Sequence, residues 1–268
     1  MLTVAPSGYY AWRGRRPSAR AVRDGQLARQ LRLIHAEHRR AYGRPRLHRA
    51  LRAAGVRIGE RRVRRLMRAV GLEAHGRRRF RVTTDSAHRQ PVAANLLGRA
   101  FRVAVPNRVW AADITFLGTQ EGWVYLAVVL DLASRRIVGW AVRSTLHSDL
   151  VVAALRMAFS RRRVAPGLVH HSDQGCQYAS AEYRRVLDAH HCCVSMSRRG
   201  DCWDNAPVES FFSSLKAELQ PAPVWPTREA SAMAIADYIE RFYNARRLHS
   251  ALDYRSPADF ERTLRVAV

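Results

Sequence analysis

Almost all of the excess charge of this chain lies in its first 108 residues. That stretch holds 27 arginines and five acidic residues, a net charge of +22, whereas residues 109–268 hold 19 basic and 17 acidic residues, a net charge of +2. A segment at +22 repels itself unless a polyanion neutralises it. We therefore expect two units in one chain, of which the first binds a polyanion and the second has a different task.

The charge also limits what the partner can be. Nucleic acid is the first candidate and an anionic membrane surface the second, because an acidic small substrate would not need so many arginines. The longest apolar run, Trp123–Leu130, is too short to span a bilayer, and residues 1–12 lack the pattern of a secretory signal. Four cysteines in a chain of this size do not form a disulfide framework, which favours a reducing cytoplasm. We expect no membrane partner.

The first 108 residues divide into an arm, a helical domain and a linker. Residues 1–24 are predicted to be a basic arm, residues 25–74 a helix-turn-helix domain, and residues 75–108 a basic linker that can lie along a phosphate backbone. Within the domain, apolar residues recur every three or four positions in three stretches, and glycines mark the turns between them.

The last helix of this domain, which begins at Glu60, combines an apolar face with many arginines. The arginines predicted to bind DNA are Arg61, Arg62, Arg64, Arg65 and Arg68. Two short helices joined by a glycine-containing turn, with arginines on the second, are typical of a helix-turn-helix that lies on DNA. The alternative is a basic helix whose arginines are only solvated. The net charge of the whole stretch favours DNA.

From Val109 onward the pattern is that of a mixed α/β domain. Three apolar runs predict an antiparallel meander of strands at about residues 109–117, 123–132 and 136–142. Further strands are predicted at 167–171 and 193–196, and helices at about 148–162, 181–189, 205–219 and 227–246.

Three acids in these elements stand where a charge is costly or where ligands commonly bind. Asp113 interrupts an apolar strand, Asp173 follows the end of another strand, and Glu209 lies in the first turn of a helix. Each acid alone could be a cap or a surface group, but together they indicate an oxygen-only site for Mg²⁺ or Mn²⁺. Zinc is not expected, because no CxxC pair frames the histidines and cysteines.

Three motifs around these acids resemble those of a known enzyme family. They are Asp113-Ile-Thr, His171-Ser-Asp173-Gln-Gly and Asp204-Asn-Ala-Pro-Val-Glu209-Ser-Phe-Phe, with 35 residues between Asp173 and Glu209. With them, the chain resembles transposases of the insertion-sequence-three family, within the retroviral-integrase-like Asp-Asp-Glu superfamily. Matching segments such as Ser7-Gly8-Tyr9-Tyr10 and Ser256-Pro257-Ala258 extend the resemblance over nearly the whole chain.

The resemblance implies a ribonuclease H-like core with a mixed five-stranded sheet over residues 109–268, preceded by the small all-α domain. It implies that Asp113, Asp173 and Glu209 are catalytic and hold two Mg²⁺ or Mn²⁺ ions. It also implies a DNA contact for Lys216, the only lysine, which follows Glu209 by two helical turns. The residues expected to support the site are His171, Asn205 and Trp203. For His171 and Trp203, purely structural roles stay open.

The function expected from the resemblance is that of a transposase. Such an enzyme cleaves the ends of a mobile element and joins the 3′-hydroxyl ends to target DNA by two-metal phosphoryl transfer. The expected partners are both DNAs, further copies of the chain assembled on DNA, and an upstream-frame helix-turn-helix protein, separate or fused. The expected location is the bacterial cytoplasm, at the nucleoid. Two alternatives stay open: a DNA-binding regulator without catalysis, and a ribonuclease H-like nuclease without a joining step.

Overall fold

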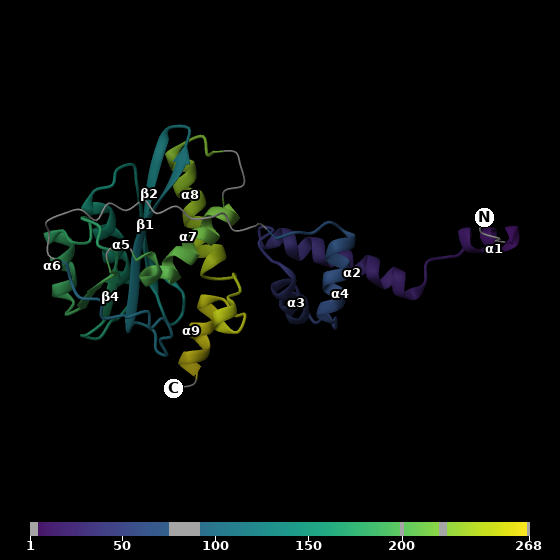
Figure 1. The fold of residues 1–268 in the computed structure, drawn as a ribbon, viewed down its shortest axis with the longest axis horizontal. Helices are drawn as coiled ribbons and strands as arrows, with labels where there is room; N and C mark the ends of the chain where they lie inside the picture. The colour runs from purple at the N-terminus through teal and green to yellow at the C-terminus, as the bar shows by residue number, and fades with distance from the viewer. Residues whose placement is uncertain (1–4, 75–91, 199–200, 220–223, 267–268) are drawn as a thin grey trace. The chain divides into compact units, whose positions relative to one another are not determined.

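The computed structural model describes residues 5–74, 92–198, 201–219 and 224–266 (Figure 1). The chain divides into two compact units, Met1–His75 and Gly76–Val268, and each is described by itself. Within the described ranges, no helix is long and apolar enough to cross a bilayer.

The first unit is helical. Its elements are α1 (Pro6–Arg13), α2 (Ala19–Glu37), α3 (Arg44–Ala53) and α4 (Glu60–Ala69). The helices α2, α3 and α4 pack together and bury a small core of Leu27, Leu31, Leu47, Leu51, Val63 and Leu66. Gly55 ends α3 with a φ of +78°, a conformation that glycine adopts without strain. The predicted helix-turn-helix domain is thereby confirmed, with α3 and α4 as its two helices.

The range predicted to be a basic arm is helical over much of its length. It contains α1, and α2 begins at Ala19, inside the same range. The Ser18 side chain caps α2 by accepting a hydrogen bond from the amide of Ala21 at 3.2 Å. The helical part of the first unit therefore starts earlier in the chain than the boundary predicted at residue 25.

The second unit is built on a mixed five-stranded sheet in the order β3-β2-β1-β4-β5, as the fold class predicted. Its strands are β1 (Val109–Thr119), β2 (Gly122–Asp131), β3 (Ile137–Arg143), β4 (Val169–Ser172) and β5 (Cys193–Met196). The first three form the predicted antiparallel meander, and β4 and β5 join in parallel beside β1. The pairing of β1 with β4 covers Val109–Ala111, so it stops just before Asp113.

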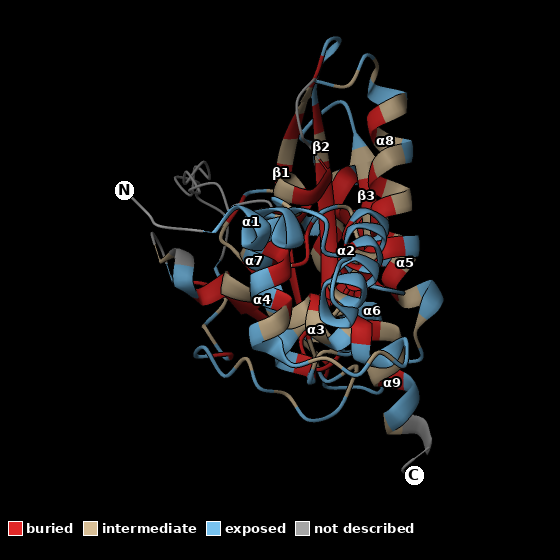
Figure 2. Cartoon of the chain, turned by 90° about the vertical axis from the view of Figure 1, so that its right-hand side faces the viewer, coloured by how far each residue is buried: buried red, intermediate tan, exposed pale blue. Residues whose placement is uncertain are grey.

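Helices cover both faces of this sheet (Figure 1), and its strands are largely buried (Figure 2). They are α5 (Ser148–Arg161) and α6 (Ala181–Ala189) on one face, and α7 (Ala206–Leu219) and α8 (Arg228–Asp237) on the other. Alternate residues of β2 enter the two cores: Val128 packs with α7 and α8, and Val129 packs with α5 and α6. The central strands are therefore buried on both sides, which gives the domain three layers.

A glycine sets the spacing between β3 and α5. A Cβ at Gly139 would lie 2.1 Å from the carbonyl oxygen of Ala154, a distance that no side chain allows. The close approach lets α5 pack tightly on the edge of the sheet. The helix itself begins at Ser148, after His147 as N-cap.

The end of the chain differs from the single last helix predicted over residues 227–246. α8 ends at Asp237, a π-helix follows over Tyr238–Tyr243, and a further helix, α9 (Pro257–Val266), comes after it. The amide of Asn244 bonds to the carbonyl of Ile239, five residues back, at 2.9 Å. Apolar spacing cannot distinguish this wider turn from an α-helical one, since both bury one continuous face.

Part of the range predicted to be a linker belongs to the second unit. Leu97 is buried, and Phe101 and Val103 pack on the apolar cluster that includes the buried face of α7. Residues 92–108 thus form a packed segment that precedes β1. Residues 75–91 of the predicted linker lie outside the described residues.

Candidate active site and nucleic-acid interface

Asp113 lies in β1, just past the end of that strand's pairing with β4. It is half-buried, and Oδ1 accepts a hydrogen bond from the amide of Ile114 at 2.8 Å. Burial raises the pKa of Asp113 well above its ordinary value, and the nearby carboxylates of Asp173 and Glu209 raise it further. The Ile114 amide and the ammonium of Lys216 oppose these effects. Ionisation of Asp113 at neutral pH therefore costs free energy in the folded chain.

Asp173 directly follows the last residue of β4 in a tight turn. Its Oδ1 accepts a hydrogen bond from the amide of Gly175 at 3.0 Å, and a Cβ at Gly175 would lie 3.0 Å from that same oxygen. The glycine therefore leaves room for the carboxylate. The turn is tied to the chain beyond β5, because Gln174 Nε2 donates to the Ser197 carbonyl at 2.9 Å and the Ser197 amide donates to the Ser172 carbonyl at 2.8 Å.

Glu209 lies in the first turn of α7, where the helix dipole favours a negative charge. It is half-buried, and burial raises its pKa. The buried side chains of Val208 and Phe212 fix how the helix is rotated against the sheet. The rotation of α7 therefore sets the direction in which Glu209 extends.

The carboxylate of Asp113 interacts electrostatically with the two other candidate acids. The negative charges of Asp173 and Glu209 both disfavour its ionisation. In the part of the chain that the structure describes, no three His, Cys, Asp or Glu side chains are close enough to hold a metal ion as they stand. The donor set still fits Mg²⁺ or Mn²⁺ in kind, since all its ligand atoms are carboxylate oxygens and a cation would relieve their repulsion.

Lys216 lies on α7 above the strand that carries Asp113. Its Nζ is 5.2 Å from the centre of the Phe116 ring in β1. Burial lowers the pKa of Lys216, while Asp113 favours its charged form. The lysine thus lies within electrostatic reach of Asp113, and its contact with DNA stays a prediction.

His171 has a role within the sheet. It is buried in β4, with Nδ1 2.8 Å from the Ser195 hydroxyl and Nε2 3.2 Å from the Ser197 hydroxyl. Burial lowers the pKa of His171, so the ring is neutral at neutral pH. These contacts favour the structural alternative, in which His171 joins β4 to β5 and the chain that follows.

The two other predicted supporting residues lie in the short 3₁₀ helix Cys202–Asn205, which leads into α7. Trp203 is 67% exposed, so it is not a core anchor. Asn205 is buried, and its Nδ2 donates a hydrogen bond to the carbonyl of Ala112 in β1 at 3.0 Å.

A charged cluster around Asp204 escaped the sequence analysis. The buried Asp204 carboxylate accepts hydrogen bonds from Arg198 Nη2 at 2.9 Å, Arg99 Nε at 2.8 Å and Asn95 Nδ2 at 2.9 Å. Arg198 above all, and then Arg99, hold the pKa of Asp204 well below its usual range. The partners Arg99 and Asn95 lie more than one hundred positions earlier in the chain, so no local pattern could indicate them.

The arginines of α4 fall into two groups. Arg62 Nη2 and Arg65 Nη2 form ion pairs with Asp24 of α2, at 2.7 and 2.5 Å, and these pairs join the two helices. The other predicted DNA contacts, Arg61, Arg64 and Arg68, are exposed and make no ion pair with the described part of the chain. The positions of these three, at i, i+3 and i+7, put them on one face of the helix. With Arg65 they line a shallow hollow of about 420 Å³.

Models of protein families match most of the chain. An HTH-like domain matches residues 22–80, a range that includes α3 and α4. An integrase core domain matches residues 103–202, and a second integrase core model matches residues 190–257. The two integrase core matches together span the five strands and the three candidate acids.

Individual relatives align over nearly their whole length. The chain is 41% identical over 257 residues to the insertion element IS600 uncharacterized 31 kDa protein of Shigella sonnei, which covers 96% of this chain and 94% of that protein. It is 40% identical over 266 residues to the transposase InsF for insertion sequence IS3A of Escherichia coli strain K12, which covers 97% of this chain and 91% of that protein.

Among solved structures, the chain is similar in fold to a component of the simian T-cell lymphotropic virus intasome in complex with the PP2A regulatory subunit B56 gamma. The TM-score is 0.50 at 16% sequence identity, and the match covers 87% of this chain and 73% of that chain. At this identity the likeness concerns the fold alone.

Proposed function

Because this chain belongs to the IS3 family of insertion-sequence transposases, we propose that it cleaves the ends of a mobile DNA element and joins them to target DNA. In the first step a water oxygen bonds to phosphorus at the element end, and the bond to the 3′ oxygen breaks, which leaves a 3′-hydroxyl. In the second step that hydroxyl bonds to a target phosphorus, and the 3′ oxygen of the target strand leaves.

One observation carries the proposal. Asp113, in the central strand of the integrase-like core, interacts with the carboxylates of Asp173 and Glu209, and both of these raise its pKa. These three residues would hold two Mg²⁺ or Mn²⁺ ions, which when bound stabilise the charge on the attacking and leaving oxygens.

The chain itself contributes position and charge. The Ile114 amide orients the Asp113 carboxylate, and the Gly175 amide orients that of Asp173. Glu209 and Lys216 lie two helical turns apart on α7, so the lysine can hold a DNA phosphate beside the reacting carboxylates. A half-buried ammonium loses less to solvent screening than an exposed one, which strengthens that contact.

The first unit supplies DNA binding in this proposal. Arg61, Arg64 and Arg68 of α4 meet the duplex, since a helix-turn-helix places its second helix in the major groove. The chain acts as a homo-oligomer on DNA, because a mobile element has two ends to process. An upstream-frame helix-turn-helix protein adds recognition of the ends. Because both substrates are DNA, the protein acts in this proposal at the bacterial nucleoid.

Cleavage of a labelled element end tests the catalytic assignment. The wild-type chain with Mn²⁺ is expected to release the 3′-hydroxyl end, and Asp113→Asn to cleave at least about 10³-fold more slowly while binding DNA equally well. Asp149→Asn is the matched control, since Asp149 is an exposed acid at the start of α5. Equal cleavage by Asp113→Asn, with contaminating nuclease excluded, would contradict the assignment.

A second assay separates the proposed activity from its two alternatives. A pre-cleaved end is incubated with plasmid target and the products are resolved by size. Joined product supports a transposase, and nicked plasmid alone supports a nuclease without a joining step. Binding without either product supports a DNA-binding regulator.

A further inference from the structure

A buried amide ties the strand that carries Asp113 to the helix that carries Glu209. Asn205 is 5% exposed, and its Nδ2 donates to the Ala112 carbonyl at 3.0 Å. That carbonyl belongs to the peptide bond that joins Ala112 to Asp113. It also follows directly after Ala111, the last residue of β1 that pairs with β4. The amide therefore bonds to β1 at the point where its neighbouring strand ends.

The other end of this link is rigid. Asn205 is the last residue before α7, and Glu209 follows four positions later, about 6 Å along the helix at 1.5 Å per residue. Asp204 beside it is held by Arg198, Arg99 and Asn95 through the charged cluster described above. A shift of Asn205 relative to β1 would therefore move Glu209 relative to Asp113.

Only one end of the Asn205 side-chain amide forms a hydrogen bond. Among the residues that the structure describes, Asn205 Oδ1 is buried and has no hydrogen-bond partner. A buried acceptor without a partner costs about 1–3 kcal/mol, which is at least as much as the single bond contributes to stability. Most buried polar groups in folded proteins have a partner, so a group left without one calls for an explanation other than stability.

We propose that Asn205 is a positioning residue, which sets the separation of Asp113 and Glu209 and thereby the affinity of their site for a divalent cation. The inference rests on the proposed function, because it assumes that these carboxylates bind the cation together. The cation-free carboxylates do not form a closed ligand set among the described residues, so a contact that holds β1 to the start of α7 bears directly on how far apart they lie.

Thermal unfolding of the full chain at increasing Mn²⁺ concentration tests this proposal without relying on activity. Asn205→Ala is expected to need at least about tenfold more Mn²⁺ than the wild type for the same rise in Tm above its metal-free value, the size usual for residues that orient metal ligands. Lost stability alone would lower Tm at every concentration and leave that Mn²⁺ requirement unchanged.

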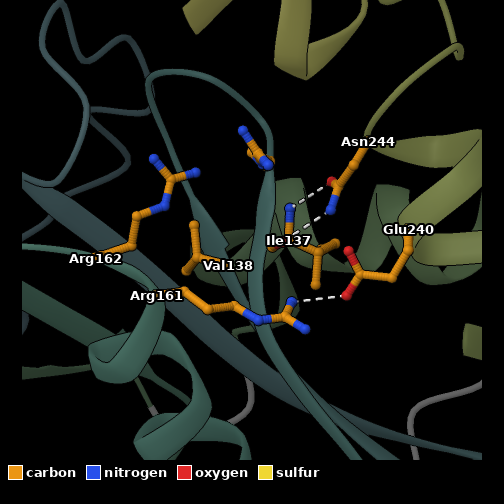
Figure 3. Close-up of a pocket in the computed structure, with 7 residues that line it drawn as sticks. Ile137, Val138, Arg161, Arg162, Glu240 and Asn244 are labelled. Carbon is orange, nitrogen blue, oxygen red and sulfur yellow. Dashed lines mark hydrogen bonds and ion pairs between the residues drawn. The ribbon is translucent and has the colours of Figure 1, made fainter.

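The chain offers a matched control. Asn244 is 3% exposed, and its amide bonds to the backbone N–H and C=O of Ile137 at 2.9 Å each (Figure 3). It thus holds an element to a strand as Asn205 does, but at β3, on the edge of the sheet away from β4. Asn244→Ala is expected to lower Tm and to leave the Mn²⁺ concentration needed for the same rise in Tm within about twofold of wild type.

The outcomes separate this proposal from the proposed function. If a folded Asn205→Ala variant needs no more Mn²⁺ than the wild type for the same rise in Tm, the positioning role alone is overturned. No Mn²⁺ response in the wild type, or an unchanged response in Asp113→Asn, overturns the cation site and this inference with it. Asn205→Ser serves as a second variant, and failure of both to fold assigns Asn205 to general stability and also overturns the proposal.

Discussion

The two units of this chain handle charge in opposite ways. On α4, Arg61, Arg64 and Arg68 point outward without an ion pair in the described chain, whereas buried acids of the second unit have partners of their own, as Glu218 has Arg247. Asp113 is the contrast within that unit, because other carboxylates and not an arginine are its main charged neighbours. Charge left uncompensated thus indicates where each unit needs a partner: a polyanion at α4 and a cation at Asp113.

Removal of the carboxylate that pairs with a buried arginine should have the largest effect on stability. Glu218 of α7 accepts hydrogen bonds from Arg247 Nε at 2.9 Å and from the Tyr238 hydroxyl at 2.8 Å, and all three side chains are buried. Glu218→Gln leaves the arginine charged and unpaired, so we expect a loss of about 3–5 kcal/mol in the free energy of unfolding, measured with urea. Glu229→Gln, at an exposed position, should change it by less than about 0.5 kcal/mol. Equal losses of stability in the two variants would show that the Glu218–Arg247 pair does not stabilise the fold.

Removal of outward charge should change DNA binding and not folding. With Arg61, Arg64 and Arg68 all changed to Ala, the slope of log K against log salt should fall by about 2.7, or about 0.9 for each phosphate contact. A charge-matched control replaces Arg20, Arg29 and Arg32, which are exposed on α2. Titrations of labelled DNA at several salt concentrations measure both slopes. The same fall in both variants would mean that α4 is not the DNA-binding face.

Neutralisation of the uncompensated acid should stabilise the protein. Because the pKa of Asp113 is raised in the folded state, the unfolded chain ionises first as pH rises, and stability is lost between the unfolded and folded pKa values. Asp113→Asn should therefore raise the free energy of unfolding without metal by about 1–3 kcal/mol at pH 7. This gain in stability should be absent below about pH 4, where Asp113 of the wild type is protonated in both the folded and the unfolded chain. Urea unfolding at a series of pH values checks it, and a loss of stability at pH 7 would contradict the expectation.

The smallest effect is expected at the internal ion pairs of the first unit. Asp24 neutralises part of the charge of Arg62 and Arg65. Asp24→Asn removes one negative charge from beside α4, so DNA affinity should rise by less than about tenfold and its salt dependence should steepen. The same salt titration measures this change. A weaker complex would show instead that Asp24 is needed to orient α4.

Local patterns predicted the elements well, and long-range contacts account for what they missed. The five strands and the helices α3 and α4 follow from apolar spacing and glycine turns, which act over a few residues. The division of the α4 arginines depends on Asp24, 38 positions before Arg62, and the Asp204 cluster depends on Arg99, 105 positions away. No spacing rule reaches such partners. The three candidate acids were found by their motifs, and their joint role stays a proposal.

The edge of the sheet at β3 has a consequence for how copies of this chain can meet. An edge strand exposes backbone groups to which another strand can add. Here the Asn244 amide occupies both backbone groups of Ile137, and the Trp140 N–H donates to Met157 Sδ at 3.4 Å. Strand addition at this edge would have to break these bonds first. An assembly on DNA is therefore expected to join its subunits through other surfaces, and β3 is protected from the edge-to-edge pairing that begins aggregation.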